Sequence, residues 1–375
     1  MIVTVIALRF LLPLLIPRFP LPAILACLVL DAADQTIFQA VTDDPLAGYQ
    51  SYDKALDVYY LAIAYCATMR NWRDPVAFGI ARFLFIYRLV GVVVFELTQQ
   101  RWVLLVFPNT FEYFFIAYEA IAVWWNPRRL RPAAVVSLAL AIWAFVKLPQ
   151  EWWVHVAQLD VTDFIDDHRW VSYVVAGVAI AVAATLVPMR RVLPPPDHHF
   201  TLAAERRMPE FQVERRKVSL RDVVLWEKVL ILSLICVIFA NILPGIEAGS
   251  VGIAVGTAVL VIANAFVSEW WYRRGRTWQN ATQSFVTMLV INVVIVIVDS
   301  LVGPDANDIP TAANLGFVVL LALFIALFDR MRATRGPDDR RLPTRKSIEL
   351  WRRRRAQARE TGLPNPPARR PASLE

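Results

Sequence analysis

The sequence predicts an all-α fold, a polytopic transmembrane bundle of about ten spans with both termini in the cytoplasm. Of the 375 residues, 57% are hydrophobic and only 19% are charged. Several uninterrupted apolar runs approach or exceed the roughly 20 residues that a helix needs to cross a bilayer. A soluble domain of this size would alternate polar and apolar surfaces far more often.

The expected spans are apolar runs bounded by charged or turn-forming residues. In order, they cover residues 21–41, 52–69, 75–97, 101–125, 132–149, 170–188, 223–246, 249–272, 280–301 and 313–331. The stretch before them, MIVTVIALRFLLPLLIPRFP, has no charged residue ahead of its apolar core and no small-residue cleavage site, so it does not fit a removed signal peptide. Arg9, Pro13 and Pro17 indicate an interfacial or short tilted helix instead.

Charge alternates between successive connections, and this alternation predicts the topology. The connections after the second, fourth, sixth and eighth spans are basic, with Arg70, Arg128, Arg190 and Arg273 among their residues. The connections after the first, fifth and ninth spans are acidic, with Asp43, Asp163 and Asp305 among theirs. Because basic loops stay on the cytoplasmic side, the pattern places both termini there.

The spans divide into two expected membrane units. Six spans lie in residues 1–188 and four in 223–331, separated by a basic linker at 189–222 and followed by a basic, largely disordered tail at 332–375. The linker and the tail are candidates for contact with anionic lipid headgroups. For the linker, a solvated segment that obeys the positive-inside rule is the favoured explanation of its charge. Nothing indicates nucleic-acid binding. The excess of arginine over lysine and the abundant alanine and valine are typical of a bacterial chain, so the bacterial plasma membrane is the expected location.

Acidic residues inside or beside the first four spans are the main functional indication. Asp31 and Asp34 share one helix face, and Asp53 and Asp57 share another. A carboxylate near the middle of a bilayer costs about 2.5–3.5 kcal/mol on insertion-derived scales, so these groups must face protein, water or a cation.

A rise of about 1.5 Å per residue along each helix places Glu112 and Arg88 at a depth in the bilayer similar to that of Asp31 and Asp34. Five carboxylates then meet two cations, Lys54 and Arg88, and the surplus negative charge calls for protons, water or a bound cation. Oxygen ligands favour Mg²⁺, Mn²⁺ or Na⁺ over Zn²⁺. The alternative is that the charges pair only to fix packing, which is favoured for Asp53, Glu96 and Glu119 near the surfaces.

The spacing of the aspartates resembles the signature of the CDP-alcohol phosphotransferase family. Asp31 and Asp34 match its first aspartate pair, and Asp53 and Asp57 match its last pair, one residue late after Gly48. The stretch IARFLFIYR at 80–88 is similar to the arginine-bearing helix that follows in that family. The resemblance covers residues 31–88.

This resemblance implies a divalent metal, Mg²⁺ or Mn²⁺, held by Asp31, Asp34, Asp53 and Asp57, with Asp57 also serving as the catalytic base. The chain departs from the family pattern in two places. Gln35 stands where the family has glycine, and Phe38-Gln39 stands where it has Ala-Arg. The charge alternation also places the aspartates on the outer side, whereas the family uses cytoplasmic CDP-linked substrates.

Three functions are therefore open. The first, which the sequence slightly favours, is a membrane-embedded metal-dependent transferase on a phosphate-bearing lipid, with Arg88, Arg82 and Glu112 as substrate-binding residues. The second is an ion- or proton-coupled secondary transporter, in which Asp31, Asp34 and Glu112 titrate or bind a cation. The third is a membrane assembly protein without turnover. Neither a Walker A motif nor H-E-x-x-H nor G-x-S-x-G occurs.

Overall fold

The computed structural model describes residues 2–41, 49–153, 196–197, 199–204, 220–242, 249–273 and 312–333, together with residues 177, 286, 289 and 290. Within these residues every regular element is a helix. The expected spans at 170–188 and 280–301 lie almost entirely outside the described residues. Most of the basic linker, the tail beyond residue 333 and the acidic connections lie outside them as well, so the predicted division into units stays a prediction.

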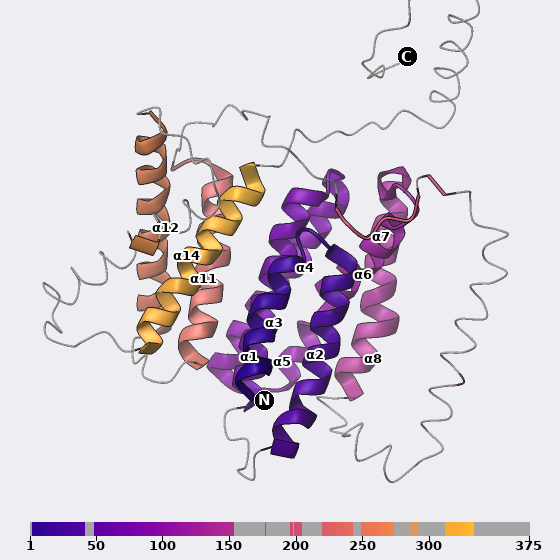
Figure 1. The fold of residues 1–375 in the computed structure, drawn as a ribbon, viewed down its shortest axis with the longest axis horizontal. Coiled ribbons are helices and arrows are strands. Elements are labelled where there is room, and N and C mark those ends of the chain that lie inside the picture. The colour runs from indigo at the N-terminus through magenta and orange to yellow at the C-terminus, as the bar shows by residue number, and fades with distance from the viewer. Residues whose placement is uncertain are drawn as a thin grey trace, which may run out of the picture.

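The N-terminal half contributes a series of antiparallel helices (Figure 1). They are α1 (Ile2–Leu11), the short 3-10 helix η1 (Leu12–Leu15), α2 (Pro20–Val41), α3 (Tyr49–Asn71), α4 (Pro75–Thr98), α5 (Trp102–Val106) and α6 (Thr110–Ala122). After the 3-10 turn η2 (Pro127–Arg129) come α7 (Pro132–Ala141), the π-helix η3 (Ile142–Lys147) and α8 (Leu148–Glu151). The C-terminal part has α11 (Val223–Ile242), α12 (Ser250–Arg273) and α14 (Ala312–Ala333).

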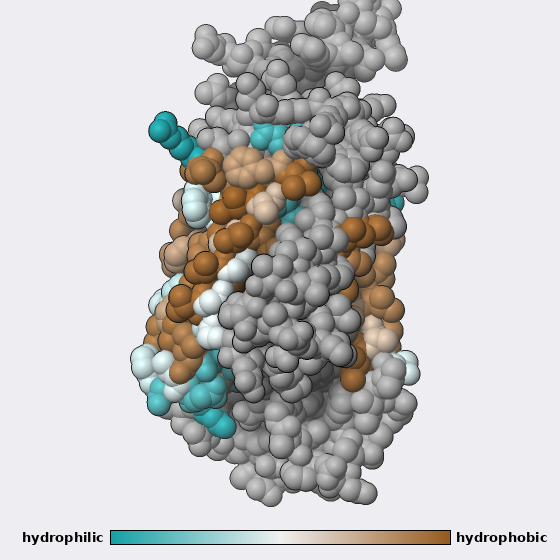
Figure 2. Space-filling model, turned by 90° about the vertical axis from the view of Figure 1, so that its left-hand side faces the viewer, coloured by the Kyte–Doolittle hydropathy of each residue, from teal (hydrophilic) through white to brown (hydrophobic). Residues whose placement is uncertain are grey.

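Four stretches of helix are long and apolar enough to cross a membrane. They are Pro75–Thr98, Pro132–Glu151, Val223–Asn241 and Ser250–Val267. Large apolar side chains point outward on two of them, with Phe145 81% and Val251 78% exposed. On the face seen in Figure 2, hydrophobic residues cover the middle of the described surface and hydrophilic residues gather toward its two ends. Such a surface suits lipid rather than water, which supports a membrane location.

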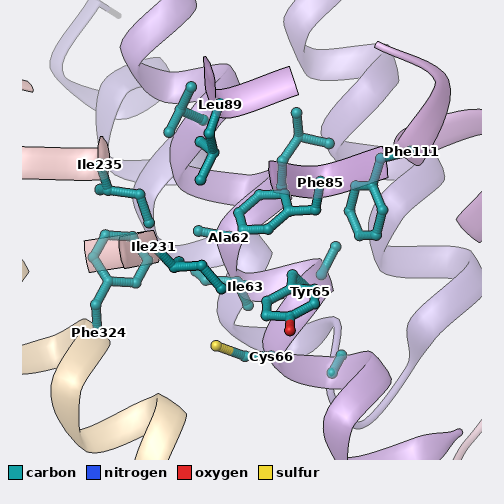
Figure 3. Close-up of a cluster of buried hydrophobic side chains, with 14 of the residues drawn as sticks. Ala62, Ile63, Tyr65, Cys66, Phe85, Leu89, Phe111, Ile231, Ile235 and Phe324 are labelled. Atoms are coloured by element: carbon teal, nitrogen blue, oxygen red, sulfur yellow. The ribbon is translucent and has the colours of Figure 1, made fainter. Parts of the chain in front are cut away.

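The core of the bundle lies around α3. From Tyr59 to Ala67 every residue of α3 is buried, because helices cover all of its sides. Tyr65 stacks on Phe85 of α4 with ring centroids 4.7 Å apart, and Phe111 of α6 lies beyond Phe85 (Figure 3). Ile231 of α11 and Phe324 of α14 approach from the other side. The C-terminal helices α11 and α14 therefore pack directly on α3 and α4.

The start of α1 and the end of α14 lie at opposite ends of the bundle (Figure 1). The predicted cytoplasmic location of both termini stays a prediction. α1 packs along α2 and α3 within the bundle. Tyr59 of α3 donates a hydrogen bond of 2.9 Å to the Phe10 carbonyl and its ring meets the Phe10 ring, so α1 is tied to the core.

The expected single span at 101–125 is broken into α5 and α6. Pro108 has no backbone N–H and disfavours the helical conformation of the residue before it. Phe107 accordingly has φ −112° and ψ 63°, outside the helical region. The broken turn reaches close to α4 at Gly91, where an added Cβ would lie 2.1 Å from the Phe107 Cβ. The sequence prediction was wrong here because it treated Pro108 as part of a continuous apolar run.

Candidate membrane-embedded polar site

A buried guanidinium joins the first three helices. Arg9 of α1 is only 5% exposed and forms an ion pair with Asp31 of α2. Its Nη2 atom also lies 3.6 Å from Oδ1 of Asp57 on α3. One arginine thus faces two carboxylates from adjacent helices. In a low-dielectric interior this arrangement compensates part of the desolvation cost of the charges and fixes how α1, α2 and α3 pack.

Glu112 is the most deeply buried carboxylate in the described part of the chain, with 3% of its surface exposed. Tyr60 of α3 donates its hydroxyl to Oε1 of Glu112 at 2.8 Å, and Nδ2 of Asn109 donates to Oε2 at 2.8 Å. Both donors are neutral. Glu112 forms no ion pair with any described residue, although Asp31, Arg88 and Lys147 are close enough to act on it electrostatically. Its carboxyl group therefore lacks a directly bonded cation.

The break between α5 and α6 lies beside Glu112. Arg88 of α4 donates from Nη1 to the Phe107 carbonyl at 3.1 Å, and the Tyr87 hydroxyl donates to the Val106 carbonyl at 2.6 Å. These bonds satisfy carbonyl groups that the broken helix leaves without helical partners. On the other side of the break, α6 begins at Thr110, so Glu112 lies in its first turn.

Two oxygen atoms at the start of α6 have no hydrogen-bond partner among the described residues. They are Oδ1 of Asn109, a residue that is 6% exposed, and Oγ1 of Thr110, which is 1% exposed. Buried polar atoms in native proteins are nearly always hydrogen-bonded, to protein or to ordered water. Together with Glu112 they form an oxygen-rich turn that can accept a proton, a water molecule or a small cation.

A second buried ion pair flanks this turn. Lys147 lies at the end of the π-helix η3, and its Nζ is 3.1 Å from Oε1 of Glu151 and 3.0 Å from Oε1 of Gln150. The same ammonium lies 4.8 Å from the ring centroid of Tyr113, the residue after Glu112. Short π-helical segments often occur at functional sites, because the extra residue redirects a side chain. Here the π-turn ends at a lysine that faces α6.

The structure brings together three of the residues singled out in the sequence, Asp31, Asp57 and Glu112, with Arg88 nearby. It places Arg82 elsewhere. Nη1 of Arg82 lies 3.3 Å from Oε2 of Glu227 on α11.

The ammonium of Lys54 lies 3.6 Å from the Phe95 ring centroid. Glu119 accepts a 2.6 Å hydrogen bond from Nε1 of Trp72, as a packing role for this residue would require.

The predicted four-aspartate metal site is described only in part. Asp34 and Asp53 lie on α2 and α3, but their side chains fall outside the described residues. Between the two described members, Asp31 and Asp57, lies the Arg9 guanidinium. No group of three histidine, cysteine, aspartate or glutamate side chains with metal-binding geometry occurs in the described part of the chain. Asp31 and Asp57 therefore both face Arg9, and the four-aspartate metal site stays a prediction.

Sequence reasoning missed Arg9, Tyr60 and Lys147 as members of this site. Arg9 interrupts an apolar run, and a charge inside such a run is a usable signal that it is buried and paired. Lys147 stands in a similar position within the run at 132–149. Tyr60 gave no comparable signal, because one tyrosine among many apolar residues is ordinary.

No protein-family model matches the chain, and neither a curated protein nor a solved structure is significantly similar to it.

Proposed function

We propose that this chain is a multi-pass integral membrane protein that moves a solute by coupling to a proton or a small cation, with Glu112 as the coupling group. The observation that supports this proposal most directly is the environment of Glu112. It is a buried carboxylate at a broken helix, and its bonded partners among the described residues are neutral donors. Ionisable residues inside membrane bundles are costly and usually functional. Discontinuous helices with polar groups at the break are the usual building blocks of transporter sites.

The coupling we propose acts through the bonds of the carboxyl group. When ionised, Glu112 accepts hydrogen bonds from Tyr60 on α3 and from Asn109 at the break. A proton or cation on the carboxyl group would compete with one of these donors and weaken the link between α3 and α6. Binding of the proton or cation would thereby favour a second arrangement of the broken helix. Coupled transport requires such a shift between two arrangements.

The metal-dependent transferase on a phosphate-bearing lipid is the second candidate. In its favour, Asp31 and Asp57 come from the two halves of the aspartate pattern and meet at one cation. We rank it below transport because that cation is Arg9, and because Arg82, one of the expected phosphate ligands, is paired with Glu227. A membrane assembly protein without turnover ranks third, because Glu112 is not balanced by an ion pair with any residue that the structure describes.

The proposed membrane placement follows the charge alternation. We propose that the end of the bundle at which α3 and α14 terminate faces the cytoplasm of a bacterial cell, since Arg70 and Arg330 lie there (Figure 1). Below, this end is called the basic end. The plasma-membrane location, the remaining spans up to about ten and the contact of linker and tail with anionic lipid belong to the same proposal.

The function can be tested by electrical recording from proteoliposomes on a solid-supported membrane. Solution jumps would deliver a pH step, a Na⁺ step, and a panel of amino acids, sugars and organic anions. We expect the full-length protein to give transient currents on the pH or the Na⁺ step and Glu112→Gln to lose them. Glu96→Gln, a partly exposed carboxylate on α4, is the matched control and should keep them. Equal currents from Glu112→Gln and the unmodified protein would refute the proposal, as would currents no larger than those of empty liposomes.

A further inference from the structure

Three arginines from separate elements meet at the basic end of the bundle. Arg18 lies between η1 and α2, Arg70 lies in the last turn of α3, and Arg330 lies in the last turn of α14. These three residues are called the arginine cluster below. None of them takes part in the polar site around Glu112.

Backbone contacts fix the geometry of the arginine cluster. Arg70 donates from Nη1 to the carbonyl of Pro17, the residue directly before Arg18. Asn71 adds a bond of 3.4 Å from Nδ2 to the same carbonyl. α14 packs along α3 and ends at the same end of the bundle, which brings Arg330 to this level (Figure 1). Partial burial, followed by repulsion from Arg18 and Arg330, lowers the pKa of the Arg70 guanidinium.

Two described carboxylates close to this end in the sequence, Asp74 and Asp329, have other partners. Asp74 accepts a 2.9 Å hydrogen bond from the backbone N–H of Val76 at the start of α4. Asp329 lies 2.8 Å from Nζ of Lys228. Arg18 binds the Ala204 carbonyl at 2.7 Å, and neither Arg18 nor Arg330 forms an ion pair with a described residue. Within the described residues, positive charge is therefore concentrated here without a carboxylate bonded to these two arginines, and an anion would relieve the repulsion.

The surroundings of Arg18 indicate which anion fits. Its guanidinium lies 5.8 Å from the ring centroid of Phe19, and Phe19 is 40% exposed. An exposed aromatic ring beside a cation, at the end of apolar helices, is the arrangement expected at the headgroup level of a membrane. Arginine pairs well with phosphate because its planar group can donate two parallel hydrogen bonds.

We propose that the arginine cluster binds the phosphate of an anionic phospholipid headgroup, with Phe19 against the adjoining acyl chains. This site is formed by helix ends and is separate from the predicted contacts of the linker and the tail. It does not depend on whether the protein transports a solute. Because the connection between η1 and α2, the end of α3 and the end of α14 each contribute one arginine, a bound headgroup would link N-terminal helices to α14.

Lipid binding can be measured on the full-length protein in phosphatidylcholine nanodiscs by titrating phosphatidylglycerol and recording both native mass spectra and the melting temperature. We expect phosphatidylglycerol to bind in a saturable manner and to raise the melting temperature. Arg330→Gln removes an exposed arginine of the cluster, and it should weaken binding about tenfold, the effect of losing one charge-assisted hydrogen bond. Arg18→Gln should act in the same direction.

Arg131→Gln is the matched control, since Arg131 is also an exposed arginine and lies just before α7, away from the cluster. It should leave the affinity nearly unchanged. Equal losses in Arg131→Gln and Arg330→Gln would mean diffuse surface charge and would overturn the site. An unchanged affinity in both Arg330→Gln and Arg18→Gln would also overturn it. If inorganic phosphate alone reproduced the full thermal shift, the ligand would be a soluble phosphate and the lipid assignment would be wrong.

Discussion

Buried charges occur in two regions of this bundle, and the two regions balance them differently. On α11, Glu227 lies 3.3 Å from Arg82 and Lys228 lies 2.8 Å from Asp329, so each charge has one partner of opposite sign. Around α1, α3 and α6, Arg9 faces two aspartates, and among the described residues Glu112 is bonded only to Tyr60 and Asn109. The α11 pairs suffice to position helices. A buried carboxylate held by neutral donors, as Glu112 is, suits a site for a proton or cation.

Removing Arg9 should have the largest effect on stability. Arg9→Met would leave the partly buried Asp31 and Asp57 without the cation they share. Breaking a fully buried pair costs about 3–5 kcal/mol, and the partial exposure of the two aspartates makes this an upper limit. We expect the free energy of unfolding in detergent micelles to fall by up to that amount. Adding Asp31→Asn and Asp57→Asn to Arg9→Met should recover much of the loss. A protein as stable with Arg9→Met as without it would show that Arg9 does not hold this region together.

Filling the space at Gly91 should have an intermediate effect. Gly91→Ala would place a methyl group 2.1 Å from the Phe107 Cβ, so the broken turn must shift away from α4. Overpacking of this kind costs about 1–3 kcal/mol. We expect a lower melting temperature together with altered currents in proteoliposomes, because the shift moves the start of α6. Gly79→Ala on the same helix has open space around it and is the control. Full stability of Gly91→Ala would contradict the close approach.

The smallest effects should come from Glu227→Gln and Glu112→Gln, which compare the two regions directly. Glu227→Gln loses its attraction to Arg82, whose side chain is 43% exposed, so about 1 kcal/mol or less is at stake. Glu112→Gln removes a charge that has no ion-pair partner among the described residues, and the melting temperature should fall no further than in Glu227→Gln. A larger loss of stability in Glu112→Gln would mean that Glu112 is a packing residue.

The apolar runs predicted most helix positions well, because a run of this length has few alternatives to a helix. Expected spans at 75–97 and 249–272 correspond to Pro75–Thr98 and Ser250–Arg273. Pro108 was only a hint of a break within the expected span at 101–125, because proline is tolerated inside many membrane helices. The approach of Arg88 and Gly91 to Phe107 shows the broken turn.

The candidate site was predictable in its acids but not in its partners. Same-face spacing on the helices pointed to Asp31 and Asp57, and depth in the expected bilayer pointed to Glu112. Which cation would meet them depends on the packing of α1, and the sequence offered no means to place that helix. Arg88 was expected to bind substrate, yet in the structure it donates to the Phe107 carbonyl. Tertiary packing decides which groups these side chains contact, and the spacing of residues along one helix carries no information about that packing.

The proposal that Glu112, unlike Glu227, binds a proton or cation can be tested most directly by isotope-edited infrared spectroscopy. Both glutamates would be titrated in the protein in lipid. Spectra of the ¹³C-glutamate-labelled protein would be recorded across a pH series and a Na⁺ series, and compared with those of Glu112→Gln and Glu227→Gln. We predict a carboxyl band that changes with pH or Na⁺, disappears in Glu112→Gln and persists in Glu227→Gln. A response that disappears in Glu227→Gln instead, or no response that depends on Glu112, would contradict the account.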